Sequence, residues 1–143
     1  MEELIEDKFN FTKNSYLTIG SITKSCLKYL PPLKPNLPQN MFIGDARGIL
    51  YVCDYNLKEN EIDIKIKTSS FQKEITCVDI NYTPKQDKIY FSLGNSIFLT
   101  NRLCKEYSKI EFDIADNITM FRVIDNQIWL ASVEIYLKLG ELS

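Results

Sequence analysis

Four consecutive segments decide the fold of this chain: Ile75-Thr-Cys-Val-Asp-Ile-Asn81, Lys88-Ile-Tyr-Phe-Ser-Leu93, Ser96-Ile-Phe-Leu-Thr100 and Lys105-Glu-Tyr-Ser-Lys-Ile-Glu-Phe112. Each segment is rich in β-branched and aromatic residues, which favour strands. Turn-forming residues separate them: Thr83-Pro84-Lys-Gln-Asp87, Gly94-Asn95 and Asn101-Arg102. Gly94-Asn95 is the clearest turn, because a two-residue hairpin loop needs positive φ, which Gly and Asn adopt at low cost. The stretch predicts one antiparallel sheet whose polar fourth strand is the outer one.

Short strands and turns continue on both sides of this stretch. Strand-forming residues occupy 15–20, 22–30, 41–44, 49–54, 61–67, 118–124, 127–131 and 134–139. Four prolines between residues 31 and 38 remove backbone donors and predict a loop, with a proline-rich ligand for a partner domain as the alternative. No segment has a helical period, so the sequence predicts an all-β chain.

A spacing of 48 residues relates the upstream strands to the central ones. It separates three pairs of residues that open corresponding strands: Met41 and Ile89, Ile49 and Ile97, Ile62 and Ile110. A period of 40 to 50 residues that carries four strands is typical of a β-propeller blade. The sequence therefore predicts a partial, WD40-like β-propeller of about two and a half four-stranded antiparallel blades, at residues 22–67, 75–112 and 118–139.

The predicted blades also set the domain organisation. Residues 1–14 are charged and have no period, which predicts a flexible leader, and residues 15–143 form the incomplete propeller. Strand 15–19 fits an outer strand that closes a propeller ring. Because a ring needs about four blades or more, we expect the chain to be a fragment of a larger propeller protein.

Composition argues against several classes of partner. The net charge is −2 and the pI is about 5.2, so the chain has no basic field to hold a nucleic acid or an anionic membrane. No window of about 18 apolar residues occurs, and the first residues are acidic. We expect a cytosolic protein that does not insert into a membrane.

Catalytic chemistry has little support in the sequence. The chain has no histidine, which removes the commonest general base. Two pairs of carboxylates share a strand face, Glu61 with Asp63 and Glu111 with Asp113, and we expect them to be solvated on outer strands. The sequence predicts a non-enzymatic protein without catalytic, cofactor-binding or metal-binding residues.

Glycine and aspartate residues mark the predicted turns. Gly44 and Gly48 flank a hairpin turn and do not lead into a helix as a phosphate-binding loop would. Asp45, Asp54 and Asp125 are expected to cap backbone amides at turns.

The cysteine and aromatic residues are expected to be buried. The cysteines lack the close CxxC spacing of metal or redox sites, so we expect reduced, buried thiols at Cys26, Cys53, Cys77 and Cys104. We expect the aromatic side chains to pack between blades rather than form a partner-binding patch: Tyr51, Phe71, Tyr90, Phe91, Phe98, Phe121, Trp129 and Tyr136. On this expectation Trp129→Ala costs roughly 3 to 5 kcal/mol.

Three stretches resemble a known family: Phe42-Ile-Gly-Asp-Ala-Arg-Gly-Ile-Leu-Tyr-Val-Cys53, Tyr82-Thr-Pro-Lys-Gln-Asp-Lys-Ile-Tyr-Phe91 and Ile128-Trp-Leu-Ala-Ser-Val-Glu-Ile-Tyr136. From about Tyr16 to Leu139, their order and spacing resemble the N-terminal propeller of the Bardet-Biedl syndrome 7 family, subunits of the BBSome. The BBSome is a coat-like adaptor that carries membrane proteins into and out of cilia.

The resemblance implies a protein-interaction scaffold in ciliary membrane-protein trafficking and cilium assembly. Its implied partners are other BBSome subunits and ciliary cargo proteins, with no nucleic acid, small-molecule substrate or cofactor. The implied location is the cytoplasm, the cilium and the basal body, with peripheral association at the ciliary membrane. The alternative is a generic propeller interaction module of another coat, pore or signalling complex.

Overall fold

The computed structural model describes residues 10–11, 20, 22, 26–30, 32, 34–56, 58–83, 86–112, 116–132 and 137–141. The elements it describes are twelve strands: β1 (Asn10–Phe11), β2 (Leu27–Leu30), β3 (Gln39–Gly44), β4 (Leu50–Asn56), β5 (Glu61–Lys67), β6 (Ile75–Thr83), β7 (Gln86–Leu93), β8 (Ser96–Thr100), β9 (Ser108–Glu111), β10 (Ile118–Ile124), β11 (Gln127–Ser132) and β12 (Leu137–Glu141). They form three sheets, ordered β1-β5-β4-β3-β2, β6-β7-β8-β9 and β10-β11-β12. We call these the first, second and third sheet.

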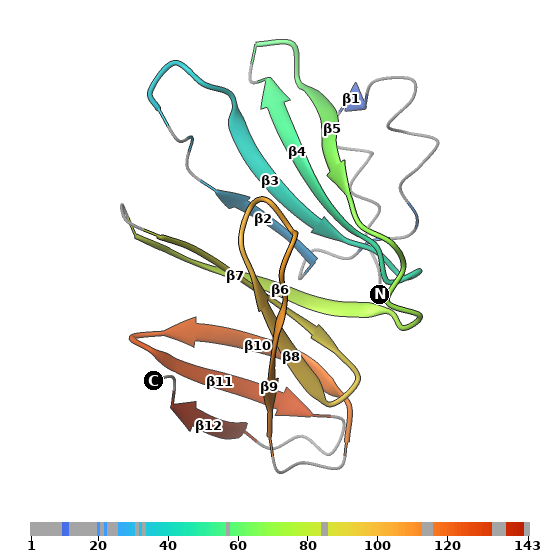
Figure 1. The fold of residues 1–143 in the computed structure, drawn as a ribbon, viewed down its shortest axis with the longest axis vertical. Helices are drawn as coiled ribbons and strands as arrows, with labels where there is room; N and C mark the ends of the chain where they lie inside the picture. Colours follow the sequence, from blue (N-terminus) through green and yellow to red (C-terminus); the bar gives the residue numbers. More distant parts are fainter. Residues whose placement is uncertain are drawn as a thin grey trace.

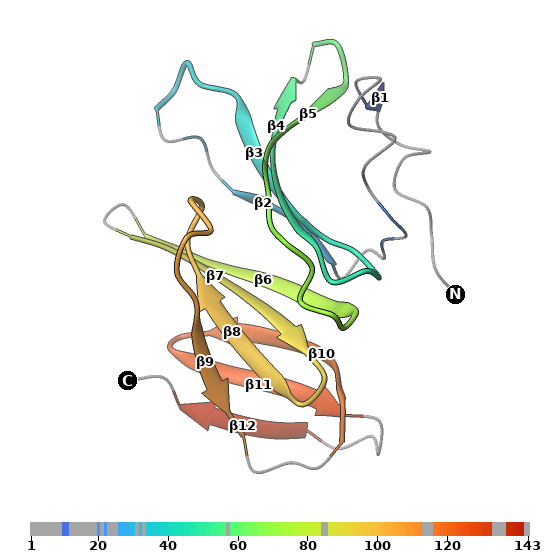
Figure 2. The ribbon, with the colours of Figure 1, turned by 45° about the vertical axis from the view of Figure 1, so that its right-hand side comes forward.

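The three sheets are stacked, with the second sheet between the other two (Figures 1 and 2). Strands β2 to β12 pair with antiparallel neighbours, and each hairpin leads directly to the next strand of its sheet. Four antiparallel strands in sequence order, followed by a second sheet of the same kind, are the arrangement of propeller blades. The prediction of an all-β, partial propeller fold is confirmed.

Apolar side chains fill the space on both sides of the second sheet. One cluster joins the first sheet to the second and contains Cys26, Leu30, Phe42, Leu50, Val52, Ile75, Val78, Ile89, Phe91, Leu93 and Cys104. Another joins the second sheet to the third and contains Cys77, Tyr90, Ile97, Ile118, Phe121, Ile128 and Leu130. Full burial stabilises the fold by roughly 1.5–3 kcal/mol for each large apolar side chain, so these clusters hold the stack together.

A third cluster lies on the outer face of the first sheet, the face turned away from the second sheet. It contains Ile22, Met41, Ile43, Ile49, Tyr51, Cys53 and Ile62. Most of these side chains are fully buried, although none of the other described sheets packs on this face.

Several strand boundaries differ from the sequence prediction. The strand expected at 105–112 begins only at Ser108, because the preceding residues form a loop. In that loop Cys104 has φ 52° and the Tyr107 hydroxyl donates to the Cys104 carbonyl at 2.8 Å. Strand β2 is shorter than the expected 22–30. Strand β12 is described at Leu137–Glu141, and the expected start at 134 lies outside the described residues.

Strand β1 lies within residues 1–14, which the sequence predicted to be a flexible leader. This strand pairs in parallel with β5, opposite Glu61 and Ile62, so residues 10–11 of the expected flexible leader join the first sheet. The strand expected at 15–19 lies outside the described residues.

Of the three residue pairs separated by 48 residues, only Met41 and Ile89 lie on corresponding faces of the first and second sheets. Met41 lies on the outer face of the first sheet, and Ile89 lies on the corresponding face of the second. Two pairs break the rule, since their first members lie on that face and their second members on the opposite one: Ile49 with Ile97, and Ile62 with Ile110. Five residues separate β3 from β4 and two separate β7 from β8, so the later strands run out of phase.

Strand β5 is not the one-faced strand that its alternation predicts. A β-bulge on this strand leaves Lys65 without an opposite residue in β4. An extra residue moves every later side chain to the other face. Ile62 and Ile64 therefore lie on the outer face of the first sheet, whereas Ile66 packs toward the second sheet.

Candidate interaction site

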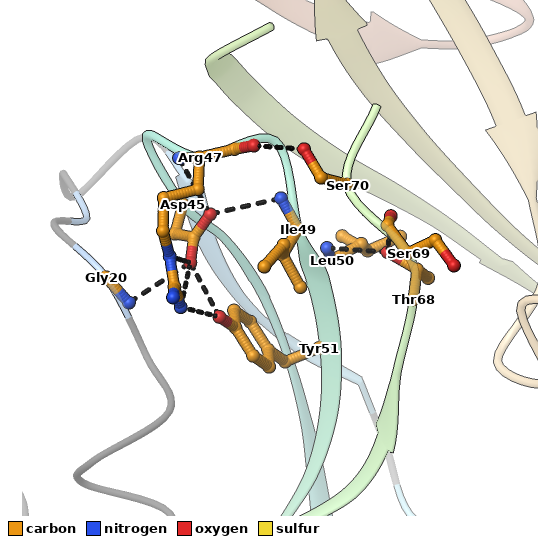
Figure 3. Close-up of polar contacts among 9 residues, drawn as sticks. All are labelled: Gly20, Asp45, Arg47, Ile49, Leu50, Tyr51, Thr68, Ser69 and Ser70. Atoms are coloured by element: carbon orange, nitrogen blue, oxygen red, sulfur yellow. Dashed lines mark hydrogen bonds and ion pairs between the residues drawn. The ribbon is translucent and has the colours of Figure 1, made fainter. Parts of the chain in front are cut away.

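The turn between β3 and β4 is built around Asp45, whose side chain is buried (Figure 3). Its Oδ1 accepts hydrogen bonds from the amides of Arg47 and Ile49, both at 3.0 Å. Its Oδ2 accepts from the Tyr51 hydroxyl at 2.6 Å, from the Gly20 amide at 3.1 Å and from the Arg47 guanidinium. Asp45 therefore caps its own turn, as predicted, and also holds the chain at Gly20.

These contacts set the charge of the carboxylate. Burial alone would raise the pKa of Asp45, but hydrogen bonds from Tyr51, Ile49, Gly20 and Arg47 outweigh it and lower the pKa. Burial and the neighbouring carboxylate raise the pKa of Tyr51. At neutral pH the turn therefore holds a buried, fully hydrogen-bonded carboxylate beside a neutral phenol.

Two glycines allow the turn to approach the second sheet. Gly48 has φ 82°, and a Cβ there would lie 2.3 Å from the Lys73 carbonyl oxygen. A Cβ on Gly44 would lie 2.5 Å from Ile75 Cγ2. Both glycines therefore serve the contact between sheets, which agrees with the prediction of a structural hairpin turn.

The turn after β3 and the turn after β7 each hold the first residue of the following sheet. The Ile75 amide donates to the Asp45 carbonyl at 3.2 Å, and the Ile118 amide donates to the Gly94 carbonyl at 2.8 Å. Buried thiols repeat a second link. Cys26 Sγ donates to the Ile75 carbonyl at 3.0 Å, and Cys77 Sγ donates to the Phe121 carbonyl at 3.5 Å.

All four cysteines are free and buried, so the prediction of reduced, buried thiols is confirmed. Burial raises the pKa of Cys53 and Cys77, and it raises that of Cys104 to about 12. These thiols stay protonated at neutral pH and serve as small apolar side chains.

Sequence reasoning missed a polar bridge between the first and second sheets. Arg102, assigned to a turn, is buried, and its Nε and Nη2 lie 2.6 and 3.0 Å from the Asp87 carboxylate. Its Nη1 donates to Asn40 on β3, and Asn40 Nδ2 donates to Asp54 at 2.8 Å. Asp54 lies in β4 opposite Asp63, so the prediction that it caps a turn is wrong. No local pattern marks Arg102, because its partners are 15 and 62 residues away.

The predicted carboxylate pairs do not form a site. Asp63 forms an ion pair with Lys65 at 2.8 Å, and both side chains are about half exposed. Glu111 pairs with Lys109 at 3.3 Å, also at the surface, and Asp113 lies outside the described residues. Asp125 lies in the predicted turn before β11, with φ 49°. Within the described ranges, no three His, Cys, Asp or Glu side chains are placed to hold a metal ion.

Most of the aromatic residues pack between sheets as expected. Tyr90, Phe91 and Phe121 are buried between sheets, and Phe71 and Phe98 pack at the edge of the core. Tyr51 is also buried, but on the outer face of the first sheet rather than between two sheets. Tyr136 lies outside the described residues. Trp129 differs: 40% of its surface is exposed, so its assignment to the core is wrong.

Trp129 lies on the outer face of the third sheet, the face turned away from the second sheet. Met120 and Ile124 on β10 are each 51% exposed, and Arg122 between them is exposed. Arg122 lies opposite Trp129, and Met120 lies opposite Ala131 on β11. Leu130, on the other side of β11, is buried against the second sheet. This face is the largest group of exposed apolar side chains on one sheet of the described structure.

The stacked sheets and their repeated links define a propeller-type repeat protein, with an apolar face on its third sheet as the candidate interaction site. Over 128 residues, the chain is 24% identical to the mouse (Mus musculus) protein named BBSome complex member BBS7. The match covers 87% of this chain and 17% of the mouse protein. It is a distant likeness to one region of that protein. No family model matches the chain.

Among the described residues, no helix has the length and hydropathy that crossing a bilayer requires.

Proposed function

We propose that the chain is a non-enzymatic scaffold of the BBSome type, which acts through protein contacts in ciliary membrane-protein trafficking and cilium assembly. Its partners would be other BBSome subunits and ciliary cargo proteins. It would work in the cytoplasm, at the basal body and in the cilium, at the ciliary membrane without inserting into it.

The observation that carries this proposal is the match to the mouse BBSome protein across 87% of the chain. The match includes the hairpin around Asp45, where the buried carboxylate and two glycines fix how the first two sheets meet. These residues hold sheets together, and their hydrogen bonds are satisfied within the fold. Three large apolar side chains of the third sheet are exposed, Met120, Ile124 and Trp129, which suits contact with another protein rather than chemistry on a small molecule.

The alternative is an interaction module of another coat, pore or signalling assembly. Stacked four-stranded sheets are common to many such complexes, and the fold alone does not separate them. The identity of the partner does.

Co-expression with the BBSome subunits of the same organism tests the proposal. We expect the tagged chain to co-purify and co-elute with at least one subunit, whereas an unrelated propeller domain carrying the same tag does not. In ciliated cells the tagged chain should concentrate at the basal body or cilium. A chain that elutes alone in the presence of every BBSome subunit contradicts the proposal.

A further inference from the structure

Strands β1 and β2 lie at opposite edges of the first sheet, in the order β1-β5-β4-β3-β2. The chain that joins them therefore crosses this sheet. Side chains of the first and second sheets fill one face, which leaves the outer face for the crossing. Two residues described between the strands, Gly20 and Ile22, mark its path.

Ile22 places this part of the chain on the outer face. Its side chain is 2% exposed and packs in one cluster with Met41, Ile43 and Tyr51. None of the other described sheets packs on this face, yet Met41, Tyr51 and Cys53 are fully buried. Ile22 is therefore a described contact through which the chain before β2 closes the face.

Gly20 fixes the same part of the chain at the turn between β3 and β4. Its amide donates to Asp45 Oδ2 at 3.1 Å (Figure 3). The carboxylate has other donors, which are the amides of Arg47 and Ile49, the Tyr51 hydroxyl and the Arg47 guanidinium. Loss of the Gly20 contact therefore leaves Asp45 hydrogen-bonded, so this attachment can open without stranding a buried charge.

The attachments of the N-terminal part are few beside those that join the sheets. Strand β1 pairs only two residues with β5, Asn10 and Phe11. Gly20 adds one hydrogen bond, and Ile22 adds one buried side chain. The clusters between the sheets contain many more buried apolar side chains. A unit with few buried contacts opens at a lower free energy than the whole fold.

We propose that β1, Gly20 and Ile22 belong to an N-terminal strap that closes the outer face of the first sheet and opens as a unit while the three sheets stay stacked. The closed strap keeps a second copy of the chain off this face. The open strap uncovers Met41, Tyr51 and Ile62. This inference concerns the strap alone and does not depend on a BBSome partner.

Three buried cysteines report separately on this opening, because each lies in a different cluster. Cys53 lies on the outer face, Cys104 between the first and second sheets, and Cys77 between the second and third. Maleimide labelling of the full chain, resolved by peptide mass spectrometry, gives a rate for each thiol.

The first test places a charge beneath the strap. In Ile22→Asp we expect Cys53 to react about tenfold faster or more, whereas Cys77 and Cys104 stay within about twofold of their native rates. Ile22→Val is the conservative control and should keep Cys53 slow. A Cys53 rate that Ile22→Asp leaves unchanged would overturn the proposal.

Leu103→Asp is the matched control for the added charge. Leu103 is 58% exposed in the loop after β8, away from the outer face of the first sheet. This variant should leave all three labelling rates as they are in the native protein. Acceleration of Cys53 by Leu103→Asp to the same extent as by Ile22→Asp would contradict a local strap.

A second measurement needs no variant and decides the question if Ile22→Asp unfolds the whole chain. In the native protein at low urea concentrations, the labelling rate of Cys53 should depend on urea less steeply than that of Cys77, because opening the strap exposes less surface than separating the sheets. Equal rates with equal urea dependence would show that strap and sheets open together, against the proposal. Co-purification with BBSome subunits is an independent measurement, so failure of the proposed function leaves these labelling rates unaffected.

Discussion

The outer faces of the first and third sheets are alike in chemistry and opposite in exposure. Both present large apolar side chains from the middle strands of a sheet, Tyr51 on one and Trp129 on the other. The apolar side chains of the first face are buried, and two described residues from before β2 belong to it: Ile22 lies in its cluster, and the Gly20 amide donates to Asp45. The third face has no such cover among the described residues. The difference teaches that apolar pattern identifies a contact face but does not say whether the contact lies within the chain.

The largest effect is expected at Phe42, which is buried between the first and second sheets. Phe42→Ala should destabilise the protein by roughly 3–5 kcal/mol, because it empties space between the first two sheets. Denaturant unfolding followed by circular dichroism gives the free energy. Phe42→Leu is the matched control and should cost less than half as much; equal losses would mean that the site does not depend on packing.

The attachment at Asp45 comes next. Asp45→Asn should cost about 2 kcal/mol, because it replaces an acceptor of Tyr51 and Arg47 by a group that also donates. The control is Asp63→Asn, which removes the exposed ion pair between Asp63 and Lys65. This variant should lower the free energy of unfolding by at most about 1 kcal/mol.

The pH dependence of stability in the native protein and in Asp45→Asn shows how much the charge of the Asp45 carboxylate contributes. The folded pKa of Asp45 is lowered, so its contribution is fully present above the unfolded value of about 3.9 and is lost as pH falls through the folded pKa. The stability gap between the native protein and Asp45→Asn should therefore narrow below about pH 4. A gap that is the same at pH 7 and at the acidic end would show that the carboxylate charge contributes nothing.

The outer face of the third sheet should tolerate the truncation of an aromatic side chain that the buried face of the first sheet does not tolerate. Trp129→Ala should cost about 1 kcal/mol, well below the 3 to 5 that a core position implies, because water already reaches the side chain. Urea unfolding measures it against Phe42→Ala. A loss as large as that of Phe42→Ala would mean that the face is covered in solution.

The smallest effect is expected at the edge of the same face. Met120→Cys should change stability by no more than about 0.5 kcal/mol and should create a thiol that maleimide reagents modify quickly. The natural Cys53, buried on the outer face of the first sheet with a raised pKa, should react far more slowly in the native protein. Modification of Cys53 at a similar rate would show that the first face opens in solution.

Local chemistry predicted the strands and turns well. Gly94 and Asn95 form the predicted turn, and Asp125 and Asn126 both have positive φ in theirs. These features depend on neighbouring residues alone, so the sequence carries them directly. The all-β class followed from the same signals.

Face assignments were less predictable, because turn length and bulges change the phase of a strand. The bulge at Lys65 divides the isoleucines of β5 between two cores, and nothing in an alternating stretch reveals it. The exposure of Trp129 could not be predicted either, because Phe42 on β3 and Tyr90 on β7 are buried on strands that correspond to β11. Burial on such a strand depends on whether another sheet packs on that face, and the residues around Trp129 in the sequence do not show this.

The unequal hairpins of the first two sheets also bear on misfolding. Neighbouring repeats with similar strands can exchange partners during folding and become trapped. Ile49, just before β4, and Ile97 on β8 are equivalent in the repeat but lie on opposite faces of their sheets. Neither strand can therefore replace the other without exposing its apolar side chains. A difference of three residues in turn length thus protects each sheet from its neighbour.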